Sequence, residues 1–343
     1  MDSFVNFTAV DIKAITSIRE GETKFGERMI VFPENEDFSQ YIKNCEQQFV
    51  LFGIPEDIGV RANFGRPGTA TAWQKAIQAL VNVQHNKYCK GSSVLVLGAL
   101  DVAAEMEISQ NLNPEIPEER KKLFDLVSKI DKDVTYVVSK IVEAGKIPII
   151  IGGGHNNAYG NIKGTALAKG KAINAINIDA HTDFRATEGR HSGNGFKYAF
   201  EEGFLKNYFI FGLHENYTPK NIFKEFKLLE SQIRYNTYEE LKIRQEKNLK
   251  IEIQNAIDFI RKEYFGIEVD LDCIANVASS AITPTGFTPD EVRSMVYQFG
   301  KANNAAYLHI CEGAPSLDYE KNIHLTGKLI AYLITDFIKS KTL

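Results

Sequence analysis

The chain has 343 residues, of which 44% are hydrophobic and 24% are charged, and its formal net charge is −4. This composition is typical of a globular protein whose core needs no disulfides, and the lack of a long basic block argues against nucleic acid as a partner. No run of 18 apolar residues occurs and the four cysteines form no Cys-x-x-Cys pair, so we expect no membrane span and a soluble, cytoplasmic protein with reduced thiols.

The first 48 residues form the first unit that we predict along the chain. They begin MDSFVNFTAVDIK, which contains two acids and no long apolar run and therefore differs from a secretory signal. We expect residues 1–48 to be an N-terminal extension packed on the core. No internal repeat and no low-complexity tract follows, so we expect residues 49–343 to form a single domain.

Short apolar runs recur along this domain, and each ends at a glycine, an acid or a turn. Most are rich in Val, Ile, Leu and Phe without alternation, which is typical of strands that helices cover on both faces. The predicted strands are FVLFG (49–53), SVLVLG (93–98), IPIIIGG (147–153), AINID (175–179), YFIFG (208–212), FGIEVDLD (265–272) and AYLHICEG (306–313).

Helical patterns lie between these runs. The clearest extends from about Pro117 to Gly145, with apolar residues at spacings of three and four. A second begins after a Thr cap at Thr288 and extends to about Gly300, and a third covers roughly residues 324–339. We expect residues 105–117 to be a surface loop. Strands that alternate with helices predict an α/β fold in which helices cover both faces of a parallel sheet.

Acids and histidines gather where the predicted strands end. In open α/β sheets, functional groups lie beyond the carboxyl ends of the strands, so these positions are the first candidates for a site. The run IPIII is followed by three glycines and a histidine, AINI by Asp-Ala-His-Thr-Asp, IEV by Asp-Leu-Asp, and AYLHIC by Glu312. The candidate metal ligands are His155, Asp179, His181, Asp183, Asp270 and Asp272.

The spacing of these residues favours a pair of metal ions. Residues i, i+2 and i+4 of an extended segment share a face, so the members of each motif can converge. Six ligands are too many for one catalytic ion with an open position, but they suit two ions that share carboxylates. Mixed oxygen and imidazole ligands favour Mn²⁺ over Zn²⁺. Two such ions roughly 3.5–4 Å apart can bridge a water and lower its pKa toward 7. Each motif alone also has a structural explanation, as a tight turn or a solvated acidic edge.

Together, GGGH, DAHTD and DxD in this order resemble the ureohydrolase superfamily, which contains arginase, agmatinase and formimidoylglutamase. The resemblance covers about residues 48–340. It implies an arginase-like fold, a three-layer α/β/α arrangement with a mostly parallel sheet of about eight strands. It also implies two Mn²⁺ ions, a small amidine or guanidine substrate whose C–N bond is hydrolysed, and a homo-oligomer, either a trimer or a hexamer.

The resemblance also implies individual roles. One Mn²⁺ would be held by His155, Asp179, Asp183 and Asp270, and the other by Asp179, His181, Asp270 and Asp272, so that Asp179 and Asp270 bridge. Asp183 would in addition act catalytically by orienting the bridging hydroxide, and Glu312 would face the substrate amidinium.

The loops indicate a substrate with two carboxylates. The segment that contains Arg61, Asn63 and Arg66 is similar to the first βα loop of formimidoylglutamases, and we expect these side chains to bind substrate. Arg185 and Arg190 follow the DAHTD motif, and two guanidinium groups suit two carboxylates. N-formimidoyl-L-glutamate, hydrolysed to L-glutamate and formamide, is the first choice.

Other features favour an arginase, agmatinase or other guanidino hydrolase that releases urea. Ser192 and Asn194 belong to a Ser-Gly-Asn run that resembles the one with which arginases hold an α-carboxylate, and Glu215 could contact a substrate amino group. His191 or His214 could shuttle protons. A metal-binding but catalytically silent scaffold is the non-enzyme alternative. The chain also departs from the family pattern, because Glu268 stands where a Ser is common and Ala275-Asn276 replaces Asp-Pro.

Overall fold

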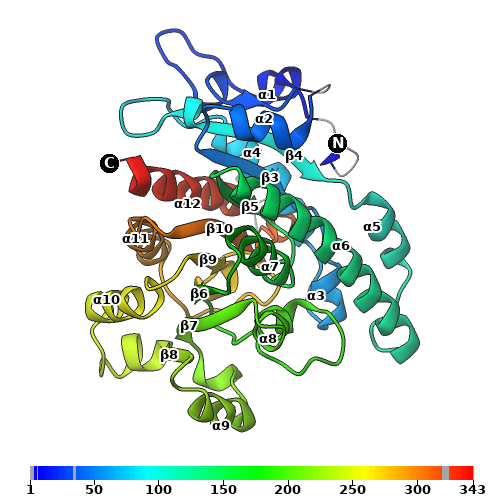
Figure 1. Ribbon diagram of the computed structural model, residues 1–343, viewed down its shortest axis with the longest axis vertical. Coiled ribbons are helices and arrows are strands. Elements are labelled where there is room, and N and C mark those ends of the chain that lie inside the picture. Colours follow the sequence, from blue (N-terminus) through cyan, green and yellow to red (C-terminus); the bar gives the residue numbers. More distant parts are fainter. Residues whose placement is uncertain (1–3, 6, 34–35, 319–323, 343) are drawn as a thin grey trace.

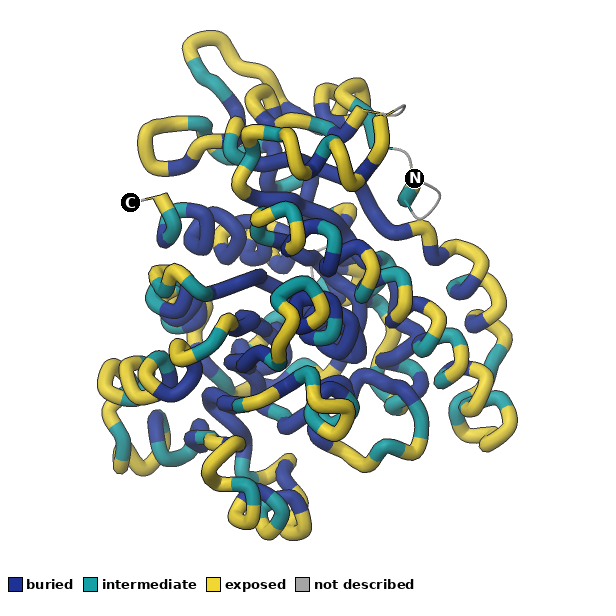
Figure 2. Tube along the Cα trace, in the orientation of Figure 1, coloured by how far each residue is buried: buried dark blue, intermediate teal, exposed yellow. Residues whose placement is uncertain are grey.

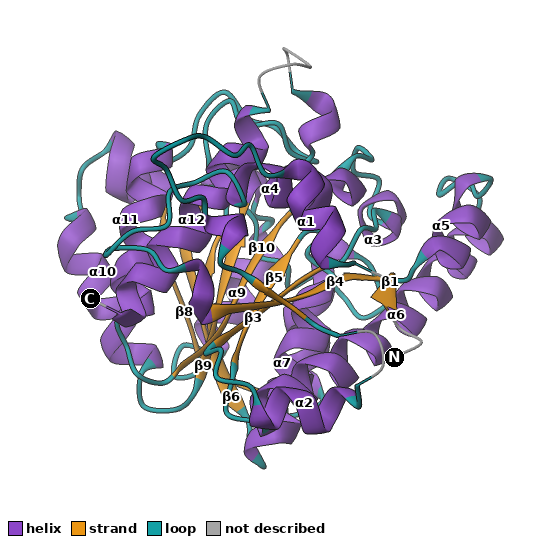
Figure 3. Cartoon of the chain, turned by 90° about the horizontal axis from the view of Figure 1, so that it is seen from above, coloured by secondary structure: helices purple, strands orange, loops and turns teal. Residues whose placement is uncertain are grey.

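The computed structural model describes residues 4–5, 7–33, 36–318 and 324–342. A sheet of ten strands runs through the middle of the molecule, and helices cover both of its faces (Figure 1 and Figure 3). The strands are β1 (Phe4–Val5), β2 (Ile30–Val31), β3 (Phe49–Gly53), β4 (Val94–Leu100), β5 (Ile147–Ile151), β6 (Ile173–Ile178), β7 (Leu205–Leu213), β8 (Ile233–Thr237), β9 (Phe265–Asp270) and β10 (Ala305–Cys311).

The strand order is β1-β4-β3-β5-β10-β9-β6-β7-β8, and β2 also pairs with β4. All pairs are parallel except β1 with β4. The eight parallel strands from β3 to β10 confirm the predicted arginase-like arrangement of three layers. β1 and β2 lie within the first 48 residues, so this segment pairs with the outer edge of β4; its treatment as a separate extension stays a prediction.

The helices form one layer on each face. One core cluster joins α4, α10, α11 and α12 to one side of the sheet, and a second joins α2, α6, α7, α8 and α9 to the other. The helices are α1 (Ala9–Ile15), α2 (Phe38–Asn44), α3 (Ile58–Ala62), α4 (Ala72–Leu80), α5 (Ala103–Gln110), α6 (Pro117–Glu143), α7 (Asn157–Lys169), α8 (Gly195–Glu201), α9 (Lys220–Leu228), α10 (Leu249–Ile260), α11 (Pro289–Gly300) and α12 (Leu325–Thr342).

Burial explains why the strands lack an alternating pattern. Within β3, Leu51 packs into the first cluster while its neighbours Val50 and Phe52 pack into the second. Both faces of the strand are therefore apolar. Figure 2 shows the consequence, a buried sheet whose helices are exposed on their outer sides. In the described ranges, no helix combines the length and the apolar character that crossing a membrane requires.

The predicted helices α6, α11 and α12 are confirmed, and α11 begins at a capping box between Thr288 and Glu291. The loop predicted over residues 105–117 is wrong in its first half, which belongs to α5. Tertiary contacts stabilise this helix, because buried Glu105 pairs with Lys129 of α6 and Arg61 bonds to Ser109. The edge strand β8 was not among the predicted strands, because its sequence IRYNT contains a single aliphatic residue.

Candidate metal centre and substrate pocket

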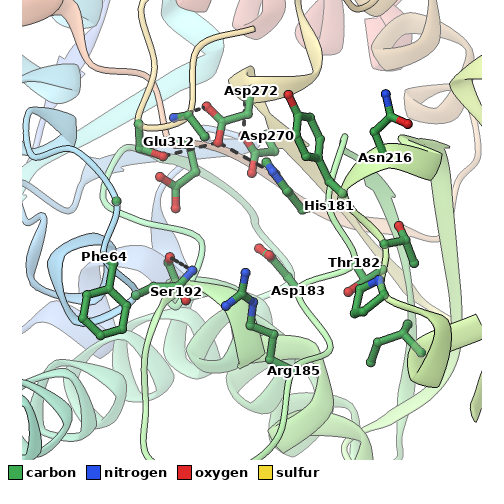
Figure 4. A pocket seen from close by; sticks show the side chains of 18 of the residues that line it. Phe64, His181, Thr182, Asp183, Arg185, Ser192, Asn216, Asp270, Asp272 and Glu312 are labelled. Atoms are coloured by element: carbon green, nitrogen blue, oxygen red, sulfur yellow. Dashed lines mark hydrogen bonds and ion pairs between the residues drawn. The ribbon is translucent and has the colours of Figure 1, made fainter. Parts of the chain in front are cut away.

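Four neighbouring strands in the centre of the sheet carry the candidate site. β5, β10, β9 and β6 lie side by side in this order and run parallel. Their carboxyl ends therefore lie at one edge of the sheet, where a cavity of about 730 Å³ opens. Figure 4 shows Asp270, Asp272 and His181 gathered on one side of this cavity, with Arg185 and Ser192 opposite them.

His155 is the centre of the first group of candidate ligands. Its Nδ1 lies 2.7 Å from Oδ2 of Asp183 and 3.3 Å from Oδ2 of both Asp179 and Asp270. One donor atom from each of the four residues lies within 4.8 Å of the others. The loops after three separate strands thus bring one imidazole and three carboxylates to one point.

His181 belongs to a second group that shares a carboxylate with the first. His181, Asp270 and Asp272 also offer donor atoms within 4.8 Å of one another. Nδ1 of His181 lies 3.5 Å from Oδ1 of Asp179, the carboxylate whose other oxygen faces His155. Asp179 and Asp270 therefore lie between the two imidazoles, as bridging ligands of two cations would.

The electrostatics of this cluster favour bound cations. Burial, together with the charges of Asp179 and Asp272, raises the pKa of Asp270 well above its ordinary value. Burial and the neighbouring Asp272 raise the pKa of Glu312 to about 8. For His181, burial alone would lower the pKa, but the hydrogen bond and charge of Asp179 raise it to about 10. Without cations the acids can therefore not all be ionised together.

Two buried atoms also fit a metal pair. Among the described residues, Nδ1 of His155 and Oε2 of Glu312 have no hydrogen-bond partner, although both are buried. The nearest neighbours of Nδ1 of His155 are carboxylate oxygens of Asp183, Asp179 and Asp270, at 2.7 to 3.3 Å, so this nitrogen lies where a metal ligand would. The donor set of two imidazoles and four carboxylates fits two divalent cations such as Mn²⁺.

The loop before His155 depends on a buried acid that the sequence analysis did not single out. Both Gly152 and Gly153 adopt positive φ, and a Cβ on Gly153 would lie 2.7 Å from Oε1 of Glu56. Glu56 accepts hydrogen bonds from the backbone N–H of Gly154 and from Nδ2 of Asn157. Its carboxylate thus fixes the turn that presents His155, and no pattern in the sequence indicated this.

Several predicted substrate residues line the cavity. Asn63, Arg66, Arg185 and Ser192 do so, together with Asp183 and Glu312. The amide of Asn63 donates a hydrogen bond of 3.1 Å to Oγ of Ser192. The cavity also has a wall from the segment after β7, and its lining residues Asn216, Tyr217 and Asn221 were not among the predicted substrate residues.

The structure places three other predicted substrate residues outside the cavity. Arg190 is buried, where its Nε lies 2.8 Å from Oδ2 of Asp131. Asn194 accepts a hydrogen bond from Arg190 and donates two to backbone carbonyls of its own loop. Arg61 donates to Oγ of Ser109 and to a carbonyl oxygen. These side chains bond to other parts of the chain in this structure, and their assignment to substrate binding stays a prediction.

The two candidate proton shuttles and Glu215 also lie outside the cavity. His191 is buried, and its Nδ1 accepts a hydrogen bond from the backbone of its own loop. His214 stacks on Tyr217, with the ring planes 9° apart. Glu215 forms two hydrogen bonds with Arg244 and one with Thr237. Among the described residues that line this wall, none is an acid that could receive a substrate amino group.

The sequence profile of the Arginase family matches residues 47–338. The chain belongs to the arginase family. Its similarity to a formimidoylglutamase of Streptococcus gordonii is 26% identity over 299 residues, or 83% of each chain. A formimidoylglutamase of Macrococcus caseolyticus is 26% identical over 218 residues, which is 61% of this chain and 65% of that relative.

Solved structures share the arginase-family fold of this chain. The formimidoylglutamase of Bacillus subtilis superposes with a TM-score of 0.73 at 19% identity, covering 94% of this chain and 93% of that one. A formiminoglutamase of Trypanosoma cruzi with Mn²⁺ gives 0.70 at 17% identity, with 94% and 99% covered. An agmatine ureohydrolase of Thermoplasma volcanium gives 0.67 at 22% identity, with 88% and 91% covered. The predicted superfamily, fold and class of enzyme, a metal-dependent hydrolase of amidine or guanidine groups, are thus confirmed.

Proposed function

We propose that this arginase-family chain hydrolyses a linear amidine that carries two carboxylates, N-formimidoyl-L-glutamate, to L-glutamate and formamide. The observation that carries the proposal is the distribution of charge in the cavity. Arg66 and Arg185 line it as cations, whereas its acids are the candidate ligands and Glu312, all at the strand ends. Guanidinium groups bind carboxylates in a bidentate manner, so they suit a dicarboxylate.

The same distribution disfavours arginine as the substrate. The free α-amino group of arginine would need an acidic partner away from the metal centre. The best candidate from the sequence, Glu215, pairs with Arg244 outside the cavity. The curated relatives from Streptococcus gordonii and Macrococcus caseolyticus are both named formimidoylglutamases, which supports the same substrate.

The metal-binding roles belong to the same proposal. His155, Asp179, Asp183 and Asp270 would hold one Mn²⁺, and Asp179, His181, Asp270 and Asp272 would hold the other. When bound, two such ions lower the pKa of a water and stabilise the negative charge that develops on the substrate.

The protein residues position the substrate and move its protons. Arg66 and Arg185 hold the two carboxylates, and Glu312 faces the amidinium with its free Oε2. Asp183 accepts the proton of the attacking water and passes it to the leaving nitrogen, a role that its place in the cavity allows. Glu312 and Asp183 both have positive φ, and such strained backbone is typical of functional sites.

A product assay tests this proposal. The purified full-length chain, supplied with Mn²⁺, is incubated separately with N-formimidoyl-L-glutamate, arginine and agmatine, and formamide and urea are measured. We expect formamide and glutamate from the first substrate alone. Urea from arginine or agmatine would replace the proposal with a guanidino hydrolase, and metal uptake without turnover would indicate a silent scaffold. The D179A variant is the control for contaminating activity, because it removes a ligand shared by both metal ions.

A further inference from the structure

A row of buried polar side chains crosses the sheet beneath the metal centre. Asn177 of β6, Glu268 of β9 and His309 of β10 are partners in the strand register and thus lie side by side. All three are fully buried. Their strand neighbours are apolar, so an acid and a histidine here call for a specific explanation.

Glu268 and His309 form a fixed pair. Oε2 of Glu268 lies 2.5 Å from Nδ1 of His309, and Oε1 accepts a 2.7 Å hydrogen bond from the hydroxyl of Tyr307. Nε2 of His309 lies 3.2 Å from the carbonyl oxygen of Gly152. A carbonyl oxygen only accepts hydrogen bonds, so Nε2 of His309 donates to it, and Nδ1 lies against the carboxylate. Glu268 is therefore held in place by the side chains of Tyr307 and His309.

The same carboxylate faces a candidate metal ligand. Oε2 of Glu268 lies 3.5 Å from Nε2 of His155, which has no hydrogen-bond partner among the described residues. The opposite nitrogen of this ring, Nδ1, is the one that points at Asp179, Asp183 and Asp270. When Nδ1 binds a metal ion, the ring proton must be on Nε2, directed at Glu268.

We infer that Glu268 is a positioning residue for the metal centre. Tyr307 and His309 hold the carboxylate of Glu268, which fixes the tautomer and the orientation of His155. The protein therefore binds the cation at His155 more tightly. The inference rests on the proposed function, because it presumes the pair of cations.

A third cation at this position is the competing explanation. His155, Glu268, His309 and Cys311 do offer donor atoms within 4.8 Å of one another. However, both nitrogens of His309 and both oxygens of Glu268 already have partners in the described part of the chain. A hydrogen-bonded support for His155 uses every one of these atoms and needs no further ion.

The test compares E268Q with the double variant E268Q/H309Q. The first leaves the buried His309 without its acidic partner, whereas the second replaces both members of the pair and should recover much of the lost thermal stability. Neither variant restores a carboxylate beside His155. We therefore expect both to bind one of the two Mn²⁺ ions about ten- to a hundredfold more weakly than the unchanged chain, by titration calorimetry.

Electron paramagnetic resonance gives a second readout that stability alone would not move. At limiting Mn²⁺, we expect the spectrum of coupled ions in the unchanged chain and that of isolated Mn²⁺ in both variants. D336N is the matched control, because Asp336 is a buried acid paired with Arg293 and remote from the centre. It should lose stability and keep both ions. Equal Mn²⁺ affinities in E268Q and the unchanged chain would overturn the inference alone. If the protein without substitutions showed no spectrum of coupled Mn²⁺ ions, the proposed function would be overturned as well.

Discussion

The backbone N–H of His155 donates a 2.6 Å hydrogen bond to Oε1 of Glu312. This contact ties the loop after β5 to the end of β10, and it joins a candidate metal ligand to the acid that we propose faces the substrate. The other oxygen of Glu312 has no partner among the described residues, and the residue lines the cavity. One side of the carboxylate is thus structural and the other is available to substrate.

Replacement of Glu312 by Gln separates these two functions. The amide oxygen can still accept the hydrogen bond from His155, but the side chain no longer carries the charge that balances an amidinium. We expect kcat/KM to fall about 10²–10³-fold, with Mn²⁺ content unchanged. Steady-state kinetics and metal analysis of E312Q check this. If E312Q lost bound Mn²⁺ as well as activity, Glu312 would instead be one of the metal ligands.

Arg185 gives a prediction about substrate binding. It lines the cavity and is exposed there, so R185A should raise KM for N-formimidoyl-L-glutamate about tenfold or more through the loss of a charge-assisted contact. A monocarboxylate amidine should be affected less. R244A is the matched control, because Arg244 is an arginine that pairs with Glu215 outside the cavity. If both variants raise KM equally, Arg185 has no specific role.

Arg190 should behave in the opposite way. Its guanidinium contacts the rings of both Tyr159 and Tyr198 and pairs with Asp131, and Arg190 and Asp131 are both buried. R190A leaves a buried carboxylate without its partner, so we expect the free energy of unfolding to fall by about 3–5 kcal/mol. Denaturant unfolding measures this. A stable R190A protein with a raised KM would return Arg190 to the substrate site.

The acid cluster predicts how pH affects the metal-free protein. Burial raises the pKa of Glu312 to about 8, above its unfolded value, so its contribution to stability is full below the unfolded pKa and is lost as pH rises through about 8. His181, with a pKa of about 10 in the folded protein, acts in the same direction. We therefore expect the Tm of chelator-treated protein to fall between about pH 5.5 and pH 8.5.

Added Mn²⁺ should oppose this fall, because metal ions compete with protons for the same ligands. The rise in Tm that Mn²⁺ causes should be larger at about pH 8.5 than at about pH 5.5. E312Q is the control, since it removes one titrating group and should flatten the metal-free profile. If the Tm of the metal-free protein rose between about pH 5.5 and pH 8.5, this would contradict the raised pKa values of Glu312 and His181.

The clustering of the candidate ligands could be predicted from the sequence because they follow apolar strands at fixed spacing. Asp179, His181 and Asp183 are two residues apart after β6, and this local pattern survives in the structure. The substrate residues were harder to predict, because side chains of similar chemistry act differently once the chain folds. Arg185 faces the cavity while Arg190, five positions later, turns to an acid on α6.

The same difficulty applies to the supports of the site. Glu56 and Glu268 are isolated acids in the sequence, and their partners come from distant segments, such as Asn157 and His309. Glu215 could be assigned to substrate only as long as Arg244 was unknown as its neighbour. Ion pairs between remote segments leave no periodic pattern, so the sequence cannot display them.

The central position of the strands that carry the candidate ligands also affects local unfolding of the protein. A cation shared by the loops after β5, β6 and β9 would clamp segments that helices separate in the sequence, so none of these strands could unfold locally without releasing it. Mn²⁺ should therefore slow amide hydrogen exchange in these strands more than in β8 at the edge of the sheet. The metal pair would then govern the lifetime of the native centre as well as its chemistry.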